Sequence, residues 1–179
     1  MNDTSLPTGI SFGANNGTFY GTPTELWNTT AYMVWANNSG GSSVAYLNIT
    51  VVDELPTLSY TPENLTLTKN IASTDLPLSP TLTGSGTITS WEISPNLPAG
   101  LNFGGNNGTI WGTPTVVQLT PITYTVWANN SGGSVSVTLN ITIADDLAVF
   151  SYPNSPYTIV RGYNMSDITP TITSGTIVS

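Results

Sequence analysis

Residues 124–143 read YTVWANNSGGSVSVTLNITI. Apolar side chains alternate with polar ones both before and after the Asn-Ser-Gly-Gly segment at 130–133. A period of two residues is typical of a β-strand that buries one face, and a short Gly-containing connection between two such strands predicts a hairpin. We expect eight side chains on the buried face: Tyr124, Val126, Ala128, Val135, Val137, Leu139, Ile141 and Ile143.

Much of this stretch occurs twice in the chain. The motif WANNSGGS stands at residues 35–42 and again at 127–134, and LNIT stands at 47–50 and at 139–142. Earlier in each copy, LPTGISFG at 6–13 returns as LPAGLNFG at 97–104, and GTPT at 21–24 returns at 112–115. A repeat of about 90 residues is too long for one turn of a solenoid and is typical of tandem domains.

The repeat predicts where each copy begins and ends. Residues 1–54 match the last part of a copy (the first copy), residues 55–146 form a complete copy, and residues 147–179 match the first part of another (the third copy). No stretch keeps a helical apolar pattern over three turns, and 17 Gly and 13 Pro divide the chain into short segments. We therefore expect an all-β protein of tandem antiparallel β-sandwich repeats.

The composition argues against several classes of function. The 179 residues include 2 basic and 10 acidic side chains, with no His and no Cys. Two cations cannot neutralise a nucleic-acid backbone, and a chain without His or Cys has no Ser-His-Asp triad, no Cys nucleophile and no ordinary zinc site. No apolar run approaches the roughly 20 residues of a membrane-spanning helix. We expect no enzyme activity, no cofactor, no nucleic-acid partner and no membrane span in this segment.

Three motifs carry a resemblance to a known family: LPAGL (97–101), GTIWGTPT (108–115) and YTVWANNSGGS (124–134). In this order they resemble the immunoglobulin-like (cadherin-like) repeat domain of bacterial and archaeal surface proteins. The resemblance implies tandem Ig-like sandwiches on large secreted chains at the surface of a prokaryotic cell, and it implies no catalytic residues. It places Tyr124 at the corner tyrosine of the Ig fold. Trp35 and Trp127 depart from the family, in which a small polar residue is common there.

Asn-x-Ser/Thr sequons, the acceptor sites for N-glycosylation, are frequent. They begin at ten residues: Asn2, Asn16, Asn28, Asn37, Asn48, Asn64, Asn107, Asn129, Asn140 and Asn164. Strand alternation places Asn48 and Asn140 on the outward face, and we expect both to carry glycans. Asn16 and Asn107 fall in a predicted Asn-Gly turn, and Asn37 and Asn129 fall at a hairpin tip. The alternative is that Asn is present for the left-handed turn geometry that it tolerates.

Acidic pairs recur where one copy meets the next, as Asp53-Glu54 and Asp145-Asp146. Carboxylates at a junction would suit Ca²⁺, which requires six to eight oxygen ligands. No Asp-x-Asp spacing is present, so we favour a solvated acidic linker over a Ca²⁺ site.

Four aromatic side chains are expected to point outward: Tyr20, Trp35, Trp111 and Trp127. Rings of this kind pack against neighbouring protein surfaces or stack on sugars. We favour packing within the chain or between subunits, and carbohydrate binding is the alternative.

The partial copies predict an assembly. The third copy exposes Val149, Tyr157, Ile159, Ile168 and Ile172 without the second half of a sandwich, and the first copy has the opposite deficit. Either the chain is a window of a longer covalent array, or each subunit is completed by the next through β-strand complementation; an arbitrary boundary is a third explanation. A head-to-tail contact that does not close grows a fibre. We expect a secreted, glycosylated extracellular fibre or stalk module, with a carbohydrate-binding adhesin as the alternative.

Overall fold

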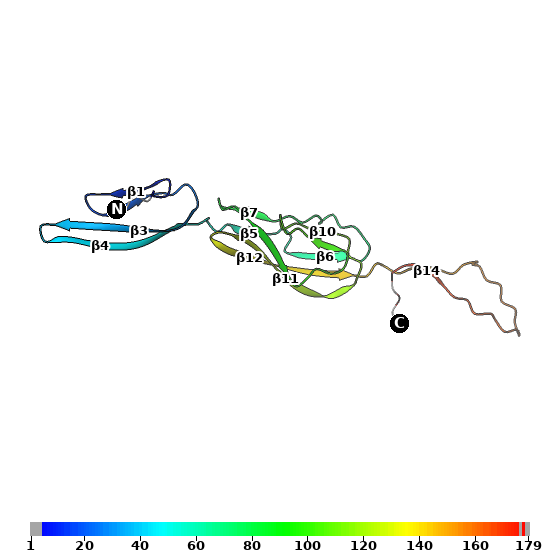
Figure 1. The fold of residues 1–179 in the computed structure, drawn as a ribbon. Helices are drawn as coiled ribbons and strands as arrows, with labels where there is room; N and C mark the ends of the chain where they lie inside the picture. The colour runs from blue at the N-terminus through cyan, green and yellow to red at the C-terminus, as the bar shows by residue number, and fades with distance from the viewer. Residues whose placement is uncertain (1–4, 176, 178–179) are drawn as a thin grey trace. The chain divides into compact units, whose positions relative to one another are not determined.

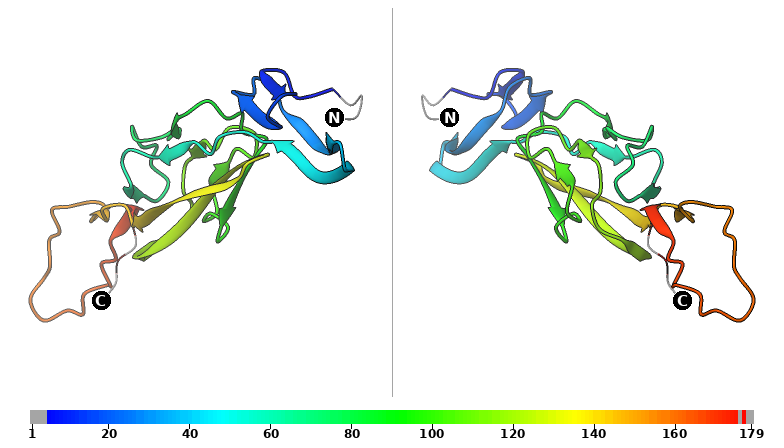
Figure 2. Two further views of the ribbon diagram at one scale, coloured as in Figure 1. Left: turned by 90° about the vertical axis from the view of Figure 1, so that its left-hand side faces the viewer. Right: turned by 90° about the vertical axis from the view of Figure 1, so that its right-hand side faces the viewer.

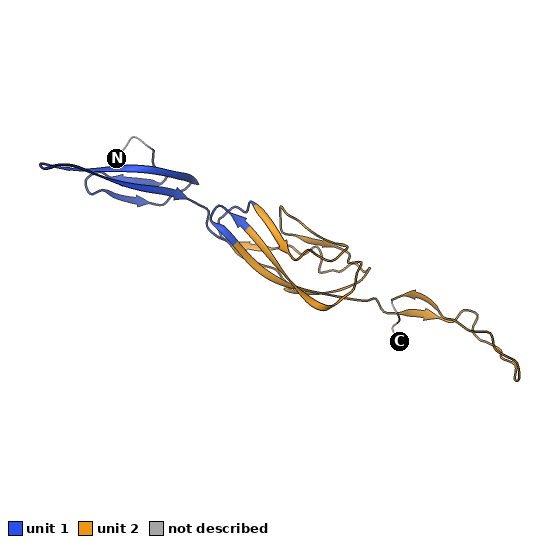
Figure 3. Ribbon diagram, turned by 60° about the horizontal axis from the view of Figure 1, so that its bottom comes forward, with its two compact units in different colours: residues 1–56, 84–89, 129–134 blue, residues 57–83, 90–128, 135–179 orange. Residues whose placement is uncertain are grey.

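A computed structural model describes residues 5–175 and residue 177 (Figure 1 and Figure 2). These residues form β-strands and no helix, so the predicted all-β, Ig-like architecture is confirmed. Within them, nothing helical is long and apolar enough to cross a membrane. The sequon at Asn2 lies outside the described residues. The chain divides into two compact units, one of residues 1–56, 84–89 and 129–134 and one of residues 57–83, 90–128 and 135–179 (Figure 3).

The first unit contains two antiparallel hairpins. β1 (Ile10–Gly13) pairs with β2 (Thr18–Gly21), and β3 (Trp27–Asn38) pairs with β4 (Gly41–Val51). Tyr32 of β3 is fully buried, and the centroid of its ring lies 6.4 Å from that of Phe19, which lies 4.9 Å from that of Phe12. Aromatic contacts at these distances are favourable and join the two hairpins.

The main sheet of the complete copy has the strand order β6-β12-β11-β8. These strands are β6 (Asn64–Thr68), β8 (Ser90–Ser94), β11 (Gln118–Asn130) and β12 (Gly133–Ala144). β6 lies along β12 in parallel, with Leu65 opposite Ile141 and Leu67 opposite Ile143. Two smaller antiparallel pairs are formed by β5 (Thr57–Ser59) with β7 (Thr81–Thr83) and by β9 (Leu101–Phe103) with β10 (Ile110–Gly112).

The predicted core face of the β11–β12 hairpin is largely confirmed. Six of the eight expected side chains are buried: Tyr124, Val126, Ala128, Leu139, Ile141 and Ile143. The prediction is wrong for Val135 and Val137, which are only half-buried. Both lie in the part of β12 next to the hairpin tip, and full burial on this strand begins at Leu139.

The glycines of the repeated motifs lie where two backbone segments touch. A Cβ on Gly100 would lie 2.1 Å from the carbonyl oxygen of Thr113, and one on Gly9 would lie 2.0 Å from that of Thr22. Their φ angles are +93° and +88°, a region in which residues with a Cβ are strained. The Leu-Pro-x-Gly and Gly-Thr-Pro-Thr motifs are therefore the two sides of one backbone contact, formed in the same way in both copies.

The third copy begins with the same strand pair as the complete copy. β13 (Val149–Ser151) pairs antiparallel with β14 (Thr171–Ser174), and Phe150 lies opposite Ile172. In β5 and β7 the corresponding pair is Leu58 and Leu82. Residues 152–170, between β13 and β14, form no strand.

Candidate functional site

Apolar positions of the third copy are exposed where their counterparts in the complete copy are buried. The repeat aligns Tyr60 with Tyr152, Leu65 with Tyr157 and Leu67 with Ile159. The residues of the complete copy are each 1% exposed, whereas those of the third copy are 49%, 40% and 59% exposed. β12 covers one edge of β6, and the Tyr60 hydroxyl donates to the carbonyl oxygen of Gly108 at 2.6 Å. The described part of the third copy contains no strands that correspond to β11 and β12.

Four of the five apolar residues that we expected to be uncovered are exposed: Val149, Tyr157, Ile159 and Ile172. The expectation is wrong for Ile168, which is half-buried. Its side chain lines a hollow inside residues 153–169, so the loop itself partly covers it.

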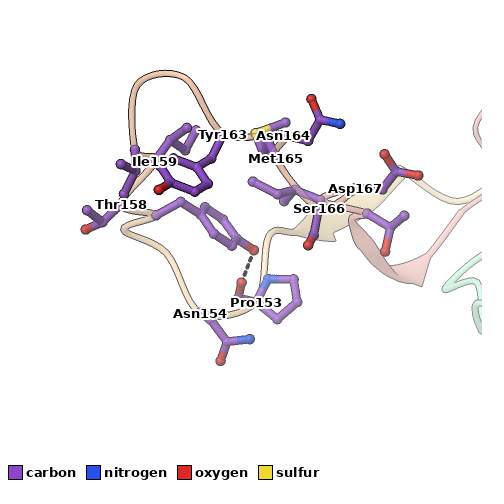
Figure 4. A pocket seen from close by; sticks show the side chains of 13 residues that line it. Pro153, Asn154, Thr158, Ile159, Tyr163, Asn164, Met165, Ser166 and Asp167 are labelled. Carbon is purple, nitrogen blue, oxygen red and sulfur yellow. Dashed lines mark hydrogen bonds between the residues drawn. The ribbon is translucent and has the colours of Figure 1, made fainter.

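This hollow has a volume of about 800 Å³ (Figure 4). Its lining includes Tyr157, Ile159, Tyr163 and Met165, and the Tyr157 hydroxyl donates to the carbonyl oxygen of Pro153. In Figure 4 the labelled side chains come from both arms of one long loop and surround open space. Large apolar side chains therefore face a space that a packed sandwich would fill.

The first copy has the complementary exposure. Leu47, Ile49 and Val51 of β4 are only half-buried, although their counterparts in β12 are fully buried: Leu139, Ile141 and Ile143. Within residues 5–175, β4 pairs with β3 alone, so the edge that β12 uses for β6 is open in β4. An open strand edge is a template for the addition of another strand.

Two loops hold the acidic pair Asp53-Glu54 within the first compact unit. Ser131 Oγ accepts from the Asp53 N–H at 2.8 Å and donates to Asp53 Oδ2 at 2.8 Å. Asn130 Nδ2 donates to the Glu54 carbonyl oxygen at 2.7 Å, and Ser85 Oγ donates to Glu54 Oε2 at 2.8 Å. We call residues 84–89 and 129–134 together the acid clasp.

Glycines allow the acid clasp to approach the acidic pair closely. A Cβ on Gly86 would lie 2.0 Å from the Glu54 carbonyl oxygen, and a Cβ on Gly132 would lie 2.1 Å from that of Asp53. Any larger residue would push the linker away. The Asn-Ser-Gly-Gly tip predicts a turn, but nothing local in the sequence predicts its contact with the linker. The recurrence of the tip together with the acidic pair is the signal for that contact.

The carboxylates considered as weak Ca²⁺ ligands have partners in the protein. Asp53 and Glu54 accept from the clasp serines, and Asp145 Oδ1 lies 3.6 Å from Lys69 Nζ and accepts from the Asp146 N–H at 3.0 Å. In the described part of the chain, no three Asp, Glu, His or Cys side chains form a group that would hold a metal ion. These carboxylates therefore fix the linker backbone in this structure.

The sequons of the two copies occupy matching turns. Asn16 and Asn107 are exposed, and in each the Oδ1 accepts at 3.1 Å from the N–H two residues later, of Thr18 and Thr109. A glycine with positive φ stands between, as the predicted Asn-Gly turn requires. The same Asn thus shapes the turn and presents an exposed amide.

Asn48 and Asn140 differ in exposure and hydrogen bonding, although the repeat aligns them. Asn48 is exposed. Asn140 is half-buried, its Nδ2 donates to Asn64 Oδ1 at 2.9 Å, and its Oδ1 accepts from Thr123 Oγ1 at 2.7 Å. The parallel pairing of β6 with β12 thus places two sequons side by side, which one copy alone did not reveal. Of the remaining candidates, Asn129 is half-buried and these are exposed: Asn28, Asn37, Asn64 and Asn164.

The four aromatic candidates lie on four different strands. Tyr20 in β2, Trp35 in β3 and Trp111 in β10 are exposed. Trp127 in β11 is half-buried, between the buried residues Val126 and Ala128, so its outward direction leaves it less accessible than we expected.

Buried tyrosines support the sandwich. Burial raises the pKa of Tyr60 far above its ordinary value. Burial also raises the pKa of Tyr124, whose hydroxyl donates to Gln118 Oε1 at 3.2 Å. The corresponding hydroxyl of Tyr32 donates to the Ser5 carbonyl oxygen at 2.7 Å. Each of the three hydroxyls thus anchors its ring by a hydrogen bond within its own copy.

Sequence comparison identifies the family. The family described as "Putative Ig domain" matches residues 1–52 and again residues 55–144. The chain belongs to this family. The chain is also similar to the serine-rich adhesin for platelets of Staphylococcus aureus. It is 30% identical to the protein of strain MRSA252 over 139 residues, and this match covers 75% of this chain and 10% of that protein. The protein of strain MSSA476 is 30% identical over the same length, which is 6% of that protein.

The chain thus matches a tenth or less of the length of these relatives. The two family matches fall on the first copy and on the complete copy.

Proposed function

We propose that this chain is a structural module of a secreted extracellular fibre or cell-surface stalk in which copies join head to tail. It has one complete domain at 55–146, flanked by partial copies at 1–54 and 147–179. One observation carries the proposal. The third copy leaves exposed the counterparts of β6, the strand that pairs with β12 in the complete copy. The first copy leaves half-buried the counterparts of β12 itself.

The complete copy supplies the geometry of the joint. β6 pairs with β12 through Leu65–Ile141 and Leu67–Ile143. By the repeat, residues 156–160 of one copy would lie in parallel along β4 of the next. Tyr157 would then face Ile49, and Ile159 would face Val51. Main-chain hydrogen bonds would close the open edge of β4, as in other cases of β-strand addition.

The apolar gain is comparable with the cost of association. The side chains that the geometry of the complete copy would cover are about half exposed: Tyr152, Tyr157, Ile159, Leu47, Ile49 and Val51. Covering each would gain about half of the roughly 1.5–3 kcal/mol of a full burial, or roughly 4.5–9 kcal/mol together. Association costs roughly 4–15 kcal/mol of translational and rotational freedom. Because the gain and the cost overlap, we expect self-association that depends on protein concentration. Hydrogen bonds at the open edge of β4 would strengthen it.

Family and relatives support a place outside a prokaryotic cell. The chain belongs to an Ig-like family and resembles proteins named as adhesins. The fold and the absence of His and Cys from the sequence fit a structural role better than catalysis. The exposed sequons, Asn48 and Asn107 among them, support N-glycosylation of the fibre surface.

The test is sedimentation velocity of the whole chain over a wide range of concentration, followed by electron microscopy of the concentrated sample. We expect the mean mass to grow through multiples of the chain mass and linear particles to form. A matched variant, Ile159→Asp, would place a charge in the joint while leaving the complete copy intact. A wild-type chain that stays monomeric throughout contradicts the proposal.

A second candidate function is carbohydrate binding at a surface adhesin. Exposed Trp35 and Trp111 favour it, because such rings offer a flat apolar face to a sugar. The discriminating experiment is a glycan array probed with wild type and with Trp111→Ala. Binding that the variant loses, from a chain that does not self-associate, would favour the adhesin over the fibre.

A further inference from the structure

The tip of the β3–β4 hairpin repeats half of the acid clasp. Asn38, Ser39 and Gly40 correspond to Asn130, Ser131 and Gly132, and the residues are identical. The local geometry also repeats: the Gly40 N–H donates to Asn38 Oδ1 at 2.8 Å, and the Gly132 N–H donates to Asn130 Oδ1 at 2.9 Å. The tip is thus folded in the shape that grips the acidic pair in the complete copy.

This tip is open. Asn38, Ser39 and Gly40 are exposed, and residues 36–38 and 40–43 line a hollow of about 450 Å³. A Cβ on Gly40 would meet only the Oδ1 of Asn38, at 3.2 Å, and the φ of Gly40 is not in the positive region. Neither the turn nor any other described residue therefore requires glycine at this position. At Gly132 the requirement comes from the Asp53 carbonyl.

The third copy presents the other half. Gly175 corresponds to Gly86, and a Cβ on Gly175 would lie 2.5 Å from the Asp146 carbonyl oxygen, as one on Gly86 would lie 2.0 Å from that of Glu54. Gly175 therefore approaches the Asp146 carbonyl oxygen as Gly86 approaches that of Glu54. The described residues of the third copy include no hairpin tip to complete the grip.

We propose that the β3–β4 tip of one copy binds Asp145-Asp146 of a second copy of this chain. Ser39 Oγ takes the place of Ser131 and donates to the Asp145 carboxylate, and Asn38 Nδ2 takes the place of Asn130 and donates to the Asp146 carbonyl oxygen. Gly40 passes beside the Asp145 backbone. This contact deepens the proposed head-to-tail fibre and rests on it, because it sets which loops meet at the joint.

The first test compares self-association of variants made in a host without N-glycosylation. Gly40→Val places a side chain where the linker backbone would lie, and Asn38→Ala with Ser39→Ala removes both donors. We expect each to weaken the apparent self-association constant at least tenfold. Asn37→Gln, which removes the overlapping sequon but keeps all three contact residues, is the matched control and should associate like wild type.

The second test uses the absence of cysteine from the chain. A mixture of Ser39→Cys and Asp145→Cys chains should form a disulfide-linked heterodimer under mild oxidation, whereas Thr24→Cys mixed with Asp145→Cys should not. Asp53→Cys with Ser131→Cys in one chain should link internally and calibrates the geometry. If wild type assembles while the Gly40→Val and double-alanine variants assemble equally well, the clasp is wrong and the fibre stands. If wild type stays monomeric, both fail.

Discussion

Truncating one isoleucine in each copy separates the stability of the domain from the strength of the joint. Ile141 is fully buried in β12, whereas its counterpart Ile49 in β4 is half-buried. Loss of a fully buried Ile side chain to Ala costs about 2–5 kcal/mol. For the dispersed chain we expect a loss of this size for Ile141→Ala and a loss of roughly half or less for Ile49→Ala, because solvent already reaches that side chain.

The two substitutions should affect self-association in the opposite order. Covering Ile49 with Tyr157 of another copy would recover the remaining burial of about 1–1.5 kcal/mol, so Ile49→Ala should weaken self-association about five- to tenfold. Ile141→Ala should leave self-association nearly unchanged. Urea unfolding followed by circular dichroism at low concentration gives the first pair of values, and sedimentation velocity gives the second. Equal losses of unfolding free energy for both variants, or association unaffected by Ile49→Ala, would show that β4 is not covered by another copy.

Three further predictions concern the complete copy and its sequons. Burial raises the pKa of Tyr60 above the value of about 10 for the unfolded chain. This group should therefore leave the free energy of unfolding unchanged below pH 10 and lower it above pH 10 by up to about 1.4 kcal/mol per pH unit. Urea titrations at alkaline pH should show a shallower fall for Tyr60→Phe. Gly108→Val should destabilise the complete copy by more than 2 kcal/mol by thermal unfolding, because a Cβ there would lie 2.5 Å from the Trp91 ring. Glycopeptide mass spectrometry should show higher occupancy at Asn48 than at Asn140, whose amide is hydrogen-bonded to its neighbour; the opposite order would contradict the role given to that contact.

The alternation of residues 124–143 was sufficient to predict the hairpin and six of its eight core side chains, because a period of two residues fixes which face is buried. It could not predict where along β12 burial begins, so the prediction was wrong for Val135 and Val137, which lie between the hairpin tip and the first buried residue of β12, Leu139. The half-buried state of Ile168 depends on how a long loop folds on itself, which no local pattern encodes.

The candidate sites show the same division between local and long-range information. The turns at Asn16 and Asn107 followed from adjacent residues and were predicted. The acid clasp joins Asp53 to Ser131, which are 78 positions apart, and the contact of Asn140 with Asn64 depends on strand order. Such contacts require the topology, although the repeated motifs contained the residues that make them.

In the proposed fibre, the third copy of one chain completes the first copy of another in the geometry of the complete copy. Electron cryo-microscopy of the protein assembled at high concentration tests it most directly. We predict that residues 156–160 lie in parallel along β4 of the neighbouring chain, with the Tyr152 hydroxyl donating to the Gly17 carbonyl oxygen as Tyr60 donates to Gly108 at 2.6 Å. A joint in which β4 keeps an open edge, or in which other surfaces meet, would contradict the account.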